Sequence, residues 1–369
     1  MKLSDTNLEQ AVEIARNTYW VGSGVNSFLN RNSYLRIYQG NGSVANLLVD
    51  PGPTSDFDDL VAKVTPVLGN IAKVNLIYIN HQDPDVVGNV PFLTKLNPQT
   101  TLLATEDTWR LVSLANAAAT TFRPIERFRD LKTAFNTNPA HRIQFIPTPF
   151  CHFRGACMLY DLETRVLFTG DLFGGIAAVG LEANHTNWAG IKAFHQLYMP
   201  SNEAIRLAVQ RIRKLDPPPL MLAPQHGGII RGELIAEFLD RMEQLQVGLD
   251  IIVSLNEQLP LLIQSLNEII AAFKELCGEE VAEQALGYFH PDGSYPALFS
   301  MTQSGVVTDI KGEPVEVVES LLRVFFRLIS DAQQNALKAR IVRILLEHNL
   351  PPFDLLLANE SAEAAPMLN

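Results

Sequence analysis

Short apolar segments that end abruptly in polar residues recur through the first part of the chain, and they constrain the fold more than any other feature. Residues 74–79 are apolar except for Asn75, which is typical of a strand buried on both faces. Such strands alternate with helical segments such as residues 201–215, where Ser201 is a predicted N-cap. The other strands predicted in this way are residues 142–147, 157–162, 166–169 and 220–223. The alternation predicts a layered α/β domain.

A β-hairpin is predicted near the N-terminus. Residues 33–38 alternate, Gly40-Asn41-Gly42 is typical of a tight turn, and residues 44–49 form the returning strand. A proline- and glycine-containing break follows the second strand. Beyond that break, Asp56 is the predicted N-cap of a helix that runs to Leu68.

The length and composition of the chain indicate two domains. The 369 residues exceed one ordinary domain, and 47% apolar with 19% charged residues excludes a wholly disordered chain. After about residue 233 the pattern becomes mostly helical as far as residue 276, although Gly248 weakens the helix and Pro260 is expected to break or kink it. An extended piece over residues 297–310 and helices over residues 315–332 and 335–348 follow. We therefore predict an α/β domain over residues 1–250 and a mostly helical region over residues 251–369.

The charge of the chain limits its partners. Lys and Arg total 29 against 40 Asp and Glu, a net charge of −11, so no general attraction to nucleic acid or anionic lipid is expected. Lys338, Arg340 and Arg343 form a basic helical segment, which we interpret as a solvated face rather than a DNA-binding one.

No apolar run approaches the roughly 18 residues that span a bilayer, and the N-terminus lacks the pattern of a secretory signal. Three cysteines do not support a disulfide framework. These features predict a cytoplasmic protein that is not bound to membranes.

Four groups of polar residues each follow a predicted strand, where ligand-binding loops of a layered α/β fold collect. Asp83 and Asp85 are close enough to repel each other in an apolar crevice unless a cation lies between them. Taken singly, the first group could be a polar turn with an Asp cap, and the others structural histidines or turn residues. Their common position and order favour one shared site. The groups are His81-Gln82-Asp83-Pro84-Asp85, His152, Asp171 and His226.

The order His-x-acid-x-Asp, His, Gly-Asp and Pro-x-His-Gly resembles the metallo-β-lactamase superfamily, and within it the diiron branch of flavodiiron proteins and related oxygen-binding diiron proteins. The resemblance covers roughly residues 10–240 and implies an αββα sandwich. Four short sequence motifs support the resemblance: Asn32-Ser33-Tyr34-Leu35, Val49-Asp50-Pro51-Gly52, Ala223-Pro224-Gln225-His226-Gly227 and Ile230-Arg231.

The resemblance also implies a ligand set for two metals. One metal would be held by His81, Asp83 and His152, the second by Asp85 and His226, and both would be bridged by Asp171. A set of three histidines and three carboxylates suits iron, whereas more histidine-rich sets favour zinc. Manganese or zinc could substitute for iron at this site.

The chain departs from the hydrolytic members of the superfamily at two positions. Those members usually have His where this chain has Asp83, and they have a further His where it has Val86. The second metal would therefore be short of one ligand, which leaves an open position for a small molecule. Flavodiiron reductases also carry a flavodoxin-like domain, whereas residues after 250 show helices and no flavin phosphate-binding loop.

Three functions follow from the resemblance. The favoured one is non-enzymatic binding of molecular oxygen, as a sensor or carrier, with the helical C-terminal region as an output or docking module. The alternatives are an oxygen or nitric oxide reductase supplied by a separate electron donor, and a dinuclear metal hydrolase. A homodimer is expected, with a signalling protein or an electron donor as a further partner.

Two residues in the segment between Asp171 and His226 are weaker candidates. We predict that His195 and Tyr198 lie in a loop over the metal pocket, where Tyr198 would donate a hydrogen bond to bound oxygen. A surface histidine and a packed tyrosine are the alternative.

Overall fold

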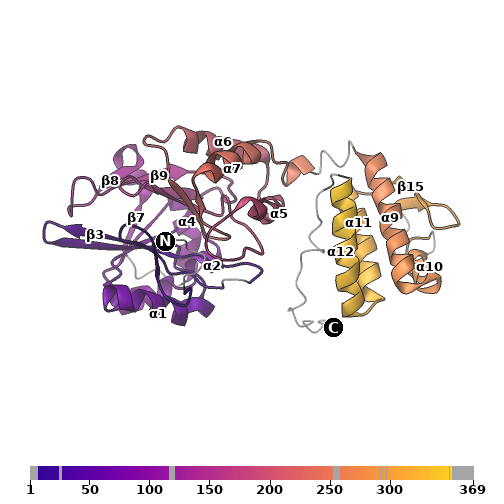
Figure 1. The fold of residues 1–369 in the computed structure, drawn as a ribbon, viewed down its shortest axis with the longest axis horizontal. Helices are drawn as coiled ribbons and strands as arrows, with labels where there is room; N and C mark the ends of the chain where they lie inside the picture. Colours follow the sequence, from indigo (N-terminus) through magenta and orange to yellow (C-terminus); the bar gives the residue numbers. More distant parts are fainter. Residues whose placement is uncertain are drawn as a thin grey trace. The chain divides into compact units, whose positions relative to one another are not determined.

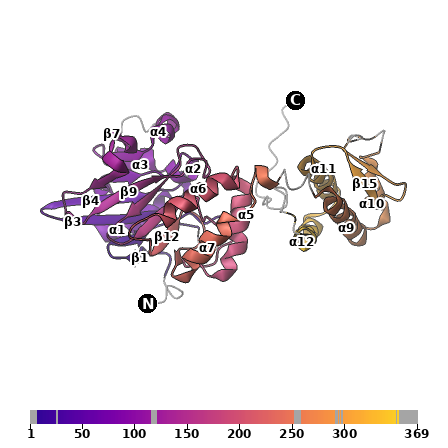
Figure 2. The ribbon, with the colours of Figure 1, turned by 90° about the horizontal axis from the view of Figure 1, so that it is seen from above.

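The chain forms two compact units, Met1–Gly248 (unit 1) and Leu249–Asn369 (unit 2), which are described separately below (Figures 1 and 2). The computed structural model describes residues 7–24, 27–115, 121–251, 258–290, 293, 295, 298–348 and 350.

Unit 1 is built on two β-sheets. The first sheet has the order β1-β2-β3-β4-β5-β6-β7; β1 to β4 pair antiparallel, and β4 to β7 pair parallel. Its strands are β1 (Val12–Ala15), β2 (Thr18–Trp20), β3 (Tyr34–Gly40), β4 (Ser43–Val49), β5 (Leu76–Tyr78), β6 (Thr101–Ala104) and β7 (Thr121–Pro124). The predicted hairpin is confirmed by β3 and β4, whose two-residue turn places Asn41 and Gly42 at positive φ, as a type I′ turn requires.

The second sheet has the order β13-β12-β11-β10-β9-β8. Every residue of β10, β11 and β12 is buried, which agrees with their mostly apolar sequences. The strands are β8 (Lys132–Ala134), β9 (Arg142–Pro147), β10 (Cys157–Asp161), β11 (Val166–Gly170), β12 (Met221–Pro224) and β13 (Ile230–Arg231).

Helices cover the outer faces of the two sheets, and the apolar core between the sheets includes Trp20, Tyr78 and Phe168. Apolar residues of α1 (Phe57–Leu68) and α3 (Val90–Leu96) pack on the first sheet, and α6 (Asn202–Arg213) and α7 (Glu233–Glu243) lie on the opposite side (Figure 1). This arrangement confirms the predicted αββα sandwich. The remaining helices of unit 1 are α2 (Pro84–Val87), α4 (Glu106–Val112) and α5 (Trp188–Tyr198), with short 3-10 turns at Thr54–Asp56, Ile71–Lys73, Ser113–Ala115, Ile125–Arg127, Arg129–Leu131 and His185–Asn187.

The described part of unit 2 is mostly helical, as predicted. Its helices surround an apolar core in which the rings of Phe273 and Phe325 stack with centroids 3.9 Å apart. Pro260 lies in the first turn of α9, where its missing N–H costs nothing, so it begins this helix instead of kinking it. The elements are α9 (Leu259–Cys277), α10 (Glu279–Gly287), β14 (Phe299–Met301), β15 (Val307–Ile310), α11 (Pro314–Arg327) and α12 (Asp331–Glu347).

One local prediction is wrong: the segment carrying His195 and Tyr198 is the helix α5 and not a loop. Asp56 occupies the predicted N-cap position of α1, although its carboxylate makes no capping hydrogen bond and instead pairs with Arg31 at 2.6 Å. Within the described ranges, no helix is both long enough and apolar enough to cross a membrane.

Candidate metal centre

Four of the six predicted ligands form one cluster in unit 1. His81, Asp83, His152 and Asp171 each offer a ligand atom, and these atoms lie within 4.8 Å of one another. His152 Nε2 lies 2.9 Å from Asp171 Oδ2 and 3.2 Å from Asp83 Oδ2. His81 Nε2 lies 3.6 Å from each of the same two oxygens. Two nitrogens and two oxygens therefore converge on one point.

The other two predicted ligands meet the opposite side of Asp171. His226 Nε2 lies 3.2 Å from Asp85 Oδ2 and 3.7 Å from Asp171 Oδ1. Asp171 thus turns Oδ2 toward His81 and His152, and Oδ1 toward His226. A carboxylate placed in this way between two groups of ligands has the geometry to bridge two cations.

The ends of three strands bring these residues together. His81 comes shortly after β5, Asp171 follows β11 directly, and His226 lies two residues beyond β12. Asp83 precedes α2 and Asp85 lies in its first turn. His152 lies in the connection between β9 and β10, farther from its strand than the sequence suggests.

A glycine permits the close approach of β11 to β5. Gly170 has a φ of +59°, and a Cβ at this position would lie 2.1 Å from the side chain of Asn80. Since Asn80 precedes His81 and Gly170 precedes Asp171, this contact brings those two ligands side by side. A residue with a side chain at position 170 would push them apart.

Hydrogen bonds behind the ligands fix two of the imidazole rings. His226 Nδ1 lies 2.7 Å from the Asn30 carbonyl, which can only accept, so the His226 Nδ1 carries the proton and Nε2 presents its lone pair to the cluster. The side chain of Asn30 also pairs with the backbone of Gly227, and His81 Nδ1 lies 3.1 Å from Asn80 Oδ1. Asn30 was not predicted, because no local pattern reveals a contact 196 residues away in sequence.

Asn32, which belongs to one of the motifs that support the family resemblance, also holds the loop of His226 in place. Its amide donates to the carbonyls of Pro224 and Gly227 at 2.9 Å each and accepts from Trp20 Nε1 at 2.8 Å. The loop that carries His226 is thereby anchored to the first sheet.

The electrostatics of the cluster favour cation binding. Burial acts to raise the pKa of Asp171, but His81, His152 and His226 together hold its pKa well below the usual range. Burial acts to lower the pKa of His152, but hydrogen bonds to Asp171 and Asp83 raise this pKa from 6.5 to about 9. Without a metal, ionised carboxylates therefore face a protonated imidazole, and a divalent cation would replace that proton.

Two unpaired atoms test whether a metal fits. His81 Nε2 and Asp171 Oδ1 are buried and have no hydrogen-bond partner within the part of the chain that the structure describes. Buried polar atoms are rarely left in this state, because each loses its interactions with water. Cations held in the two groups of ligands would satisfy both atoms, so the residues fit a dinuclear metal centre.

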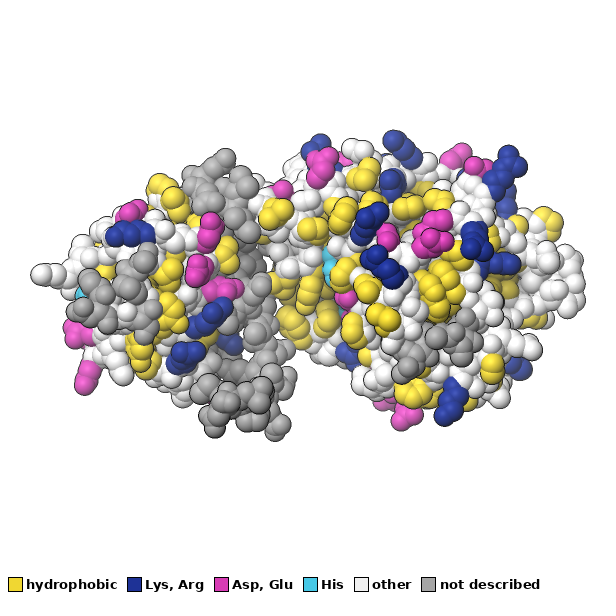
Figure 3. Space-filling view, turned by 180° about the vertical axis from the view of Figure 1, so that it is seen from behind, with side chains coloured by type: hydrophobic (Ala, Val, Ile, Leu, Met, Phe, Trp, Pro, Cys, Tyr) yellow, Lys and Arg dark blue, Asp and Glu magenta, His cyan; other side chains and the backbone are white. Residues whose placement is uncertain are grey.

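The site is poorer in histidine than a hydrolytic centre would be. Val86, which stands where hydrolytic members of the superfamily carry a histidine, lies in α2 and is completely buried in the apolar core against the first sheet. The second group therefore offers Asp85, His226 and the bridging Asp171. Figure 3 shows histidine and acidic atoms close together on this face of unit 1, among hydrophobic side chains.

His195 and Tyr198 lie on the same helix but differ in exposure. His195 is fully buried, with Nδ1 2.8 Å from the Ile191 carbonyl and Nε2 3.0 Å from the Phe173 backbone nitrogen. Its two ring nitrogens are thus occupied, and it does not face the metal pocket as a ligand. Tyr198 is 44% exposed, and its ring centroid lies 6.1 Å from that of His152.

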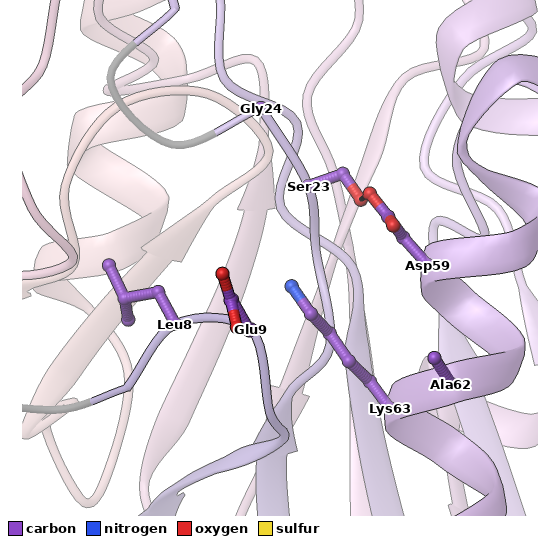
Figure 4. A pocket seen from close by; sticks show the side chains of 7 residues that line it. All are labelled: Leu8, Glu9, Ser23, Gly24, Asp59, Ala62 and Lys63. Atoms are coloured by element: carbon purple, nitrogen blue, oxygen red, sulfur yellow. Dashed lines mark hydrogen bonds between the residues drawn. The ribbon is translucent and has the colours of Figure 1, made fainter.

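A separate pocket of about 540 Å³ lies between the N-terminal segment and α1 (Figure 4). Lys63 extends into it and donates to the Gly22 carbonyl at 2.5 Å, while Ser23 donates to Asp59 at 2.7 Å. Burial lowers the pKa of Lys63. None of the seven lining residues belongs to the metal cluster; they are Leu8, Glu9, Ser23, Gly24, Asp59, Ala62 and Lys63.

Comparison with known proteins identifies the family. Residues 29–227, which include all six predicted ligands, match the family described as ODP family beta lactamase. The chain belongs to this family. The predicted resemblance to the diiron branch of the metallo-β-lactamase superfamily is confirmed.

Individual relatives share only about a quarter of their residues with this chain over the matched regions. The chain is 27% identical over 236 residues to type A flavoprotein fprA of Rhodobacter capsulatus and 24% identical over 240 residues to the nitric oxide reductase of Moorella thermoacetica. These matches cover 60% and 61% of this chain, and it spans only 52% and 58% of the two relatives.

A solved structure of the chemotaxis sensor ODP, described as a peroxy diiron species, shares the fold. It has a TM-score of 0.53 and 24% identity, and the match covers 66% of this chain and 98% of that one.

Proposed function

We propose that this protein binds molecular oxygen at a diiron centre and serves as a sensor or carrier. The observation that carries the proposal is the position of Asp171, whose two carboxylate oxygens face different histidines. His81, Asp83 and His152 would hold one iron, and Asp85 and His226 the second. When bound, two ferrous ions would supply the electrons that oxygen binding needs.

The donor set supports iron over zinc. Three imidazoles and three carboxylates make an oxygen-rich site, and such sites suit iron or manganese better than the histidine-rich sets of zinc hydrolases. For the same reason we rank the dinuclear hydrolase last among the three candidate functions. The chemotaxis sensor ODP, whose structure is described as a peroxy diiron species, supports the proposal because it shows a diiron sensor on the same fold.

A reductase is the second candidate, because one relative is named a nitric oxide reductase. Such an enzyme needs a continuous supply of electrons, and this chain would take them from a separate donor protein. Unit 2 would then be a docking module for that donor. In the favoured reading it transmits the oxygen signal, within a homodimer or to a signalling protein.

The deciding experiment uses full-length protein that has been purified without oxygen and loaded with ferrous iron. Iron content and the optical spectrum are measured before and after air is admitted, and again after oxygen is removed. We expect two irons per chain and a spectral change that appears with oxygen, with little oxygen consumed thereafter.

Two results would overturn the proposal. Zinc alone, or one metal per chain, in protein made in iron-rich medium would exclude the diiron centre. Rapid and sustained consumption of oxygen or nitric oxide with a reduced flavoprotein would establish the reductase instead.

A further inference from the structure

One face of α5 lies against the metal cluster. Ile191, Phe194, His195 and Tyr198 recur at three- and four-residue steps, so they share one side of the helix. The Phe194 ring centroid lies 5.4 Å from that of His226, and the Tyr198 ring lies near His152. This helix therefore contacts both groups of ligands, although it contributes no ligand itself.

The hydrogen bonds of His195 determine its tautomer. The Ile191 carbonyl can only accept, so Nδ1 must donate the proton at 2.8 Å. The Phe173 N–H can only donate, so Nε2 must accept it at 3.0 Å. Geometry alone thus requires a neutral His195 that joins α5 to the segment after β11.

That segment is the turn that carries Asp171. The Gly174 N–H donates to the Asp171 carbonyl at 2.8 Å, which makes Phe173 the third residue of a four-residue turn. Phe173 is completely buried and has a φ of +67°, a sign that marks a type II turn and that residues other than glycine rarely adopt. A type I turn would need a negative φ at this residue and a rotated peptide between Leu172 and Phe173.

The N–H of Phe173 takes no part in closing this turn. Since it is buried, it needs an acceptor from elsewhere, and the Nε2 of His195 is that acceptor. The same bond favours the positive φ, because it holds the peptide in the orientation of the type II turn. Gly174 and Gly175 leave room for this contact, since a Cβ at Gly174 would lie 2.9 Å from the Phe194 ring.

We propose that His195 is a positioning residue that holds the Asp171 turn in the conformation needed to bridge two metals. It acts through the backbone of Phe173 and not by contact with a metal. Without the acceptor on His195, the turn relaxes toward type I, Asp171 Oδ1 leaves the side of His226, and the second metal is lost first. The inference rests on the proposed diiron centre.

Two variants of similar size separate the hydrogen bond from packing. His195→Gln keeps an acceptor and a donor, whereas His195→Met fills the space without a comparable acceptor. His185→Met is the matched control, because His185 is an exposed histidine of the same unit. Full-length proteins are loaded with ferrous iron in the absence of oxygen. Iron content is then measured, together with the electron paramagnetic resonance spectrum after partial oxidation of the iron.

We expect wild type, His195→Gln and His185→Met to bind two irons with the spectrum of an exchange-coupled pair. His195→Met should keep one iron per chain and show the spectrum of an isolated ion. Two coupled irons in a folded His195→Met variant would overturn the proposal. If His195→Met does not fold, a folded His195→Gln variant that has lost the second iron overturns the proposal, and one that keeps both irons supports it.

A measurement on metal-free protein separates this inference from the proposed function. Amide hydrogen exchange over residues 171–177 should be at least about fivefold faster in His195→Met than in wild type, as expected for the loss of one buried hydrogen bond. If the exchange rate of these amides is the same in His195→Met as in wild type, His195 does not hold the turn, even if wild type binds two irons. If wild type does not bind two irons, the proposed diiron centre is wrong. The exchange measurement on metal-free protein would still decide the role of His195.

Discussion

Units 1 and 2 bury different kinds of side chain. Unit 1 buries the titratable groups of the cluster, among them His81, Asp171 and His226. In the described residues of unit 2, the buried polar side chains are Ser265 and Ser320, and the rest of the buried set is hydrophobic. Burying ionisable groups is costly, and a chain retains them where they are paired or bind an ion.

The difference indicates where chemistry is possible. The buried charged groups of unit 1 lower its stability, and such groups are typical of a functional site. The core of unit 2, built around α9 and α11, is an apolar cluster whose described residues contribute stability mainly by packing. This contrast agrees with our proposal that unit 1 binds the metals and that unit 2 interacts with a partner. Five predictions test this division.

The largest effect is expected from Asp171→Ala. Among the described residues, this change removes the one carboxylate that faces both groups of ligands, so the second metal should be lost and the first weakened. The loss of affinity should exceed the roughly 10–100-fold known for residues that merely support a ligand. Metal content after dialysis measures the effect, with the exposed Asp240→Ala as a control. Two tightly bound metals in Asp171→Ala would remove the bridging role.

Phe325→Ala should destabilise unit 2 and leave the metals in place. The lost ring leaves a cavity against Phe273, with a cost of about 3–5 kcal/mol in the free energy of unfolding. The three tryptophans, Trp20, Trp109 and Trp188, all lie in unit 1, so their fluorescence reports on that unit alone. Circular dichroism should show an earlier transition that the fluorescence does not follow. Loss of metal from the folded variant would contradict the division.

Metal affinity should rise with pH. The pKa of His152 is raised to about 9 in the metal-free protein, so at pH 7 this residue is protonated and must lose its proton to bind a metal. Each proton released gives about a tenfold gain in affinity per pH unit until the pH passes about 9. Calorimetric titration with a divalent metal in buffers of different ionisation enthalpy counts the protons.

The same shift predicts the opposite trend for the stability of the metal-free protein. A histidine whose folded-state pKa is raised contributes stability that is fully present below its usual pKa of 6.5 and is lost as the pH rises through about 9. Metal-free protein should therefore become less stable over this range while metal binding becomes tighter. Parallel trends would show that His152 does not face the two carboxylates as described.

Local sequence patterns were sufficient for strands β3 to β5 and β9 to β12 and for the positions of the candidate ligands, but they did not reveal the short strands β6, β7, β8 and β13. Strands β10 to β12 are mostly apolar, and Asp171 and His226 come shortly after β11 and β12, where a layered α/β fold collects ligands. Family resemblance supplied the assignment of each ligand to one metal or the other. The structure brings the six residues together in two groups that share Asp171, and the assignment itself stays a prediction.

What the sequence could not show depends on contacts between distant segments. Helix α5 was missed because Gly190 and polar residues such as His195 interrupt its apolar pattern. The support that Asn30 gives to His226, and that His195 gives to Phe173, appears only when the loops are assembled. No periodic pattern encodes a single side chain that accepts a hydrogen bond from a turn.

The smallest effect is expected from Tyr198→Phe, which tests whether the edge of the cluster contributes to oxygen binding. Tyr198 extends from the last turn of α5 beside His152, and its hydroxyl would donate one hydrogen bond to bound oxygen, worth about 1 kcal/mol. Its loss should shorten the lifetime of the oxygen-bound form about fivefold without changing iron content. The decay of the optical change after oxygen removal measures this lifetime. Tyr288→Phe is the matched control, because Tyr288 is a similarly exposed tyrosine, at 41% against 44%, in unit 2. An equal lifetime in both variants would assign Tyr198 to packing against Phe194, whose ring centroid lies 4.7 Å away.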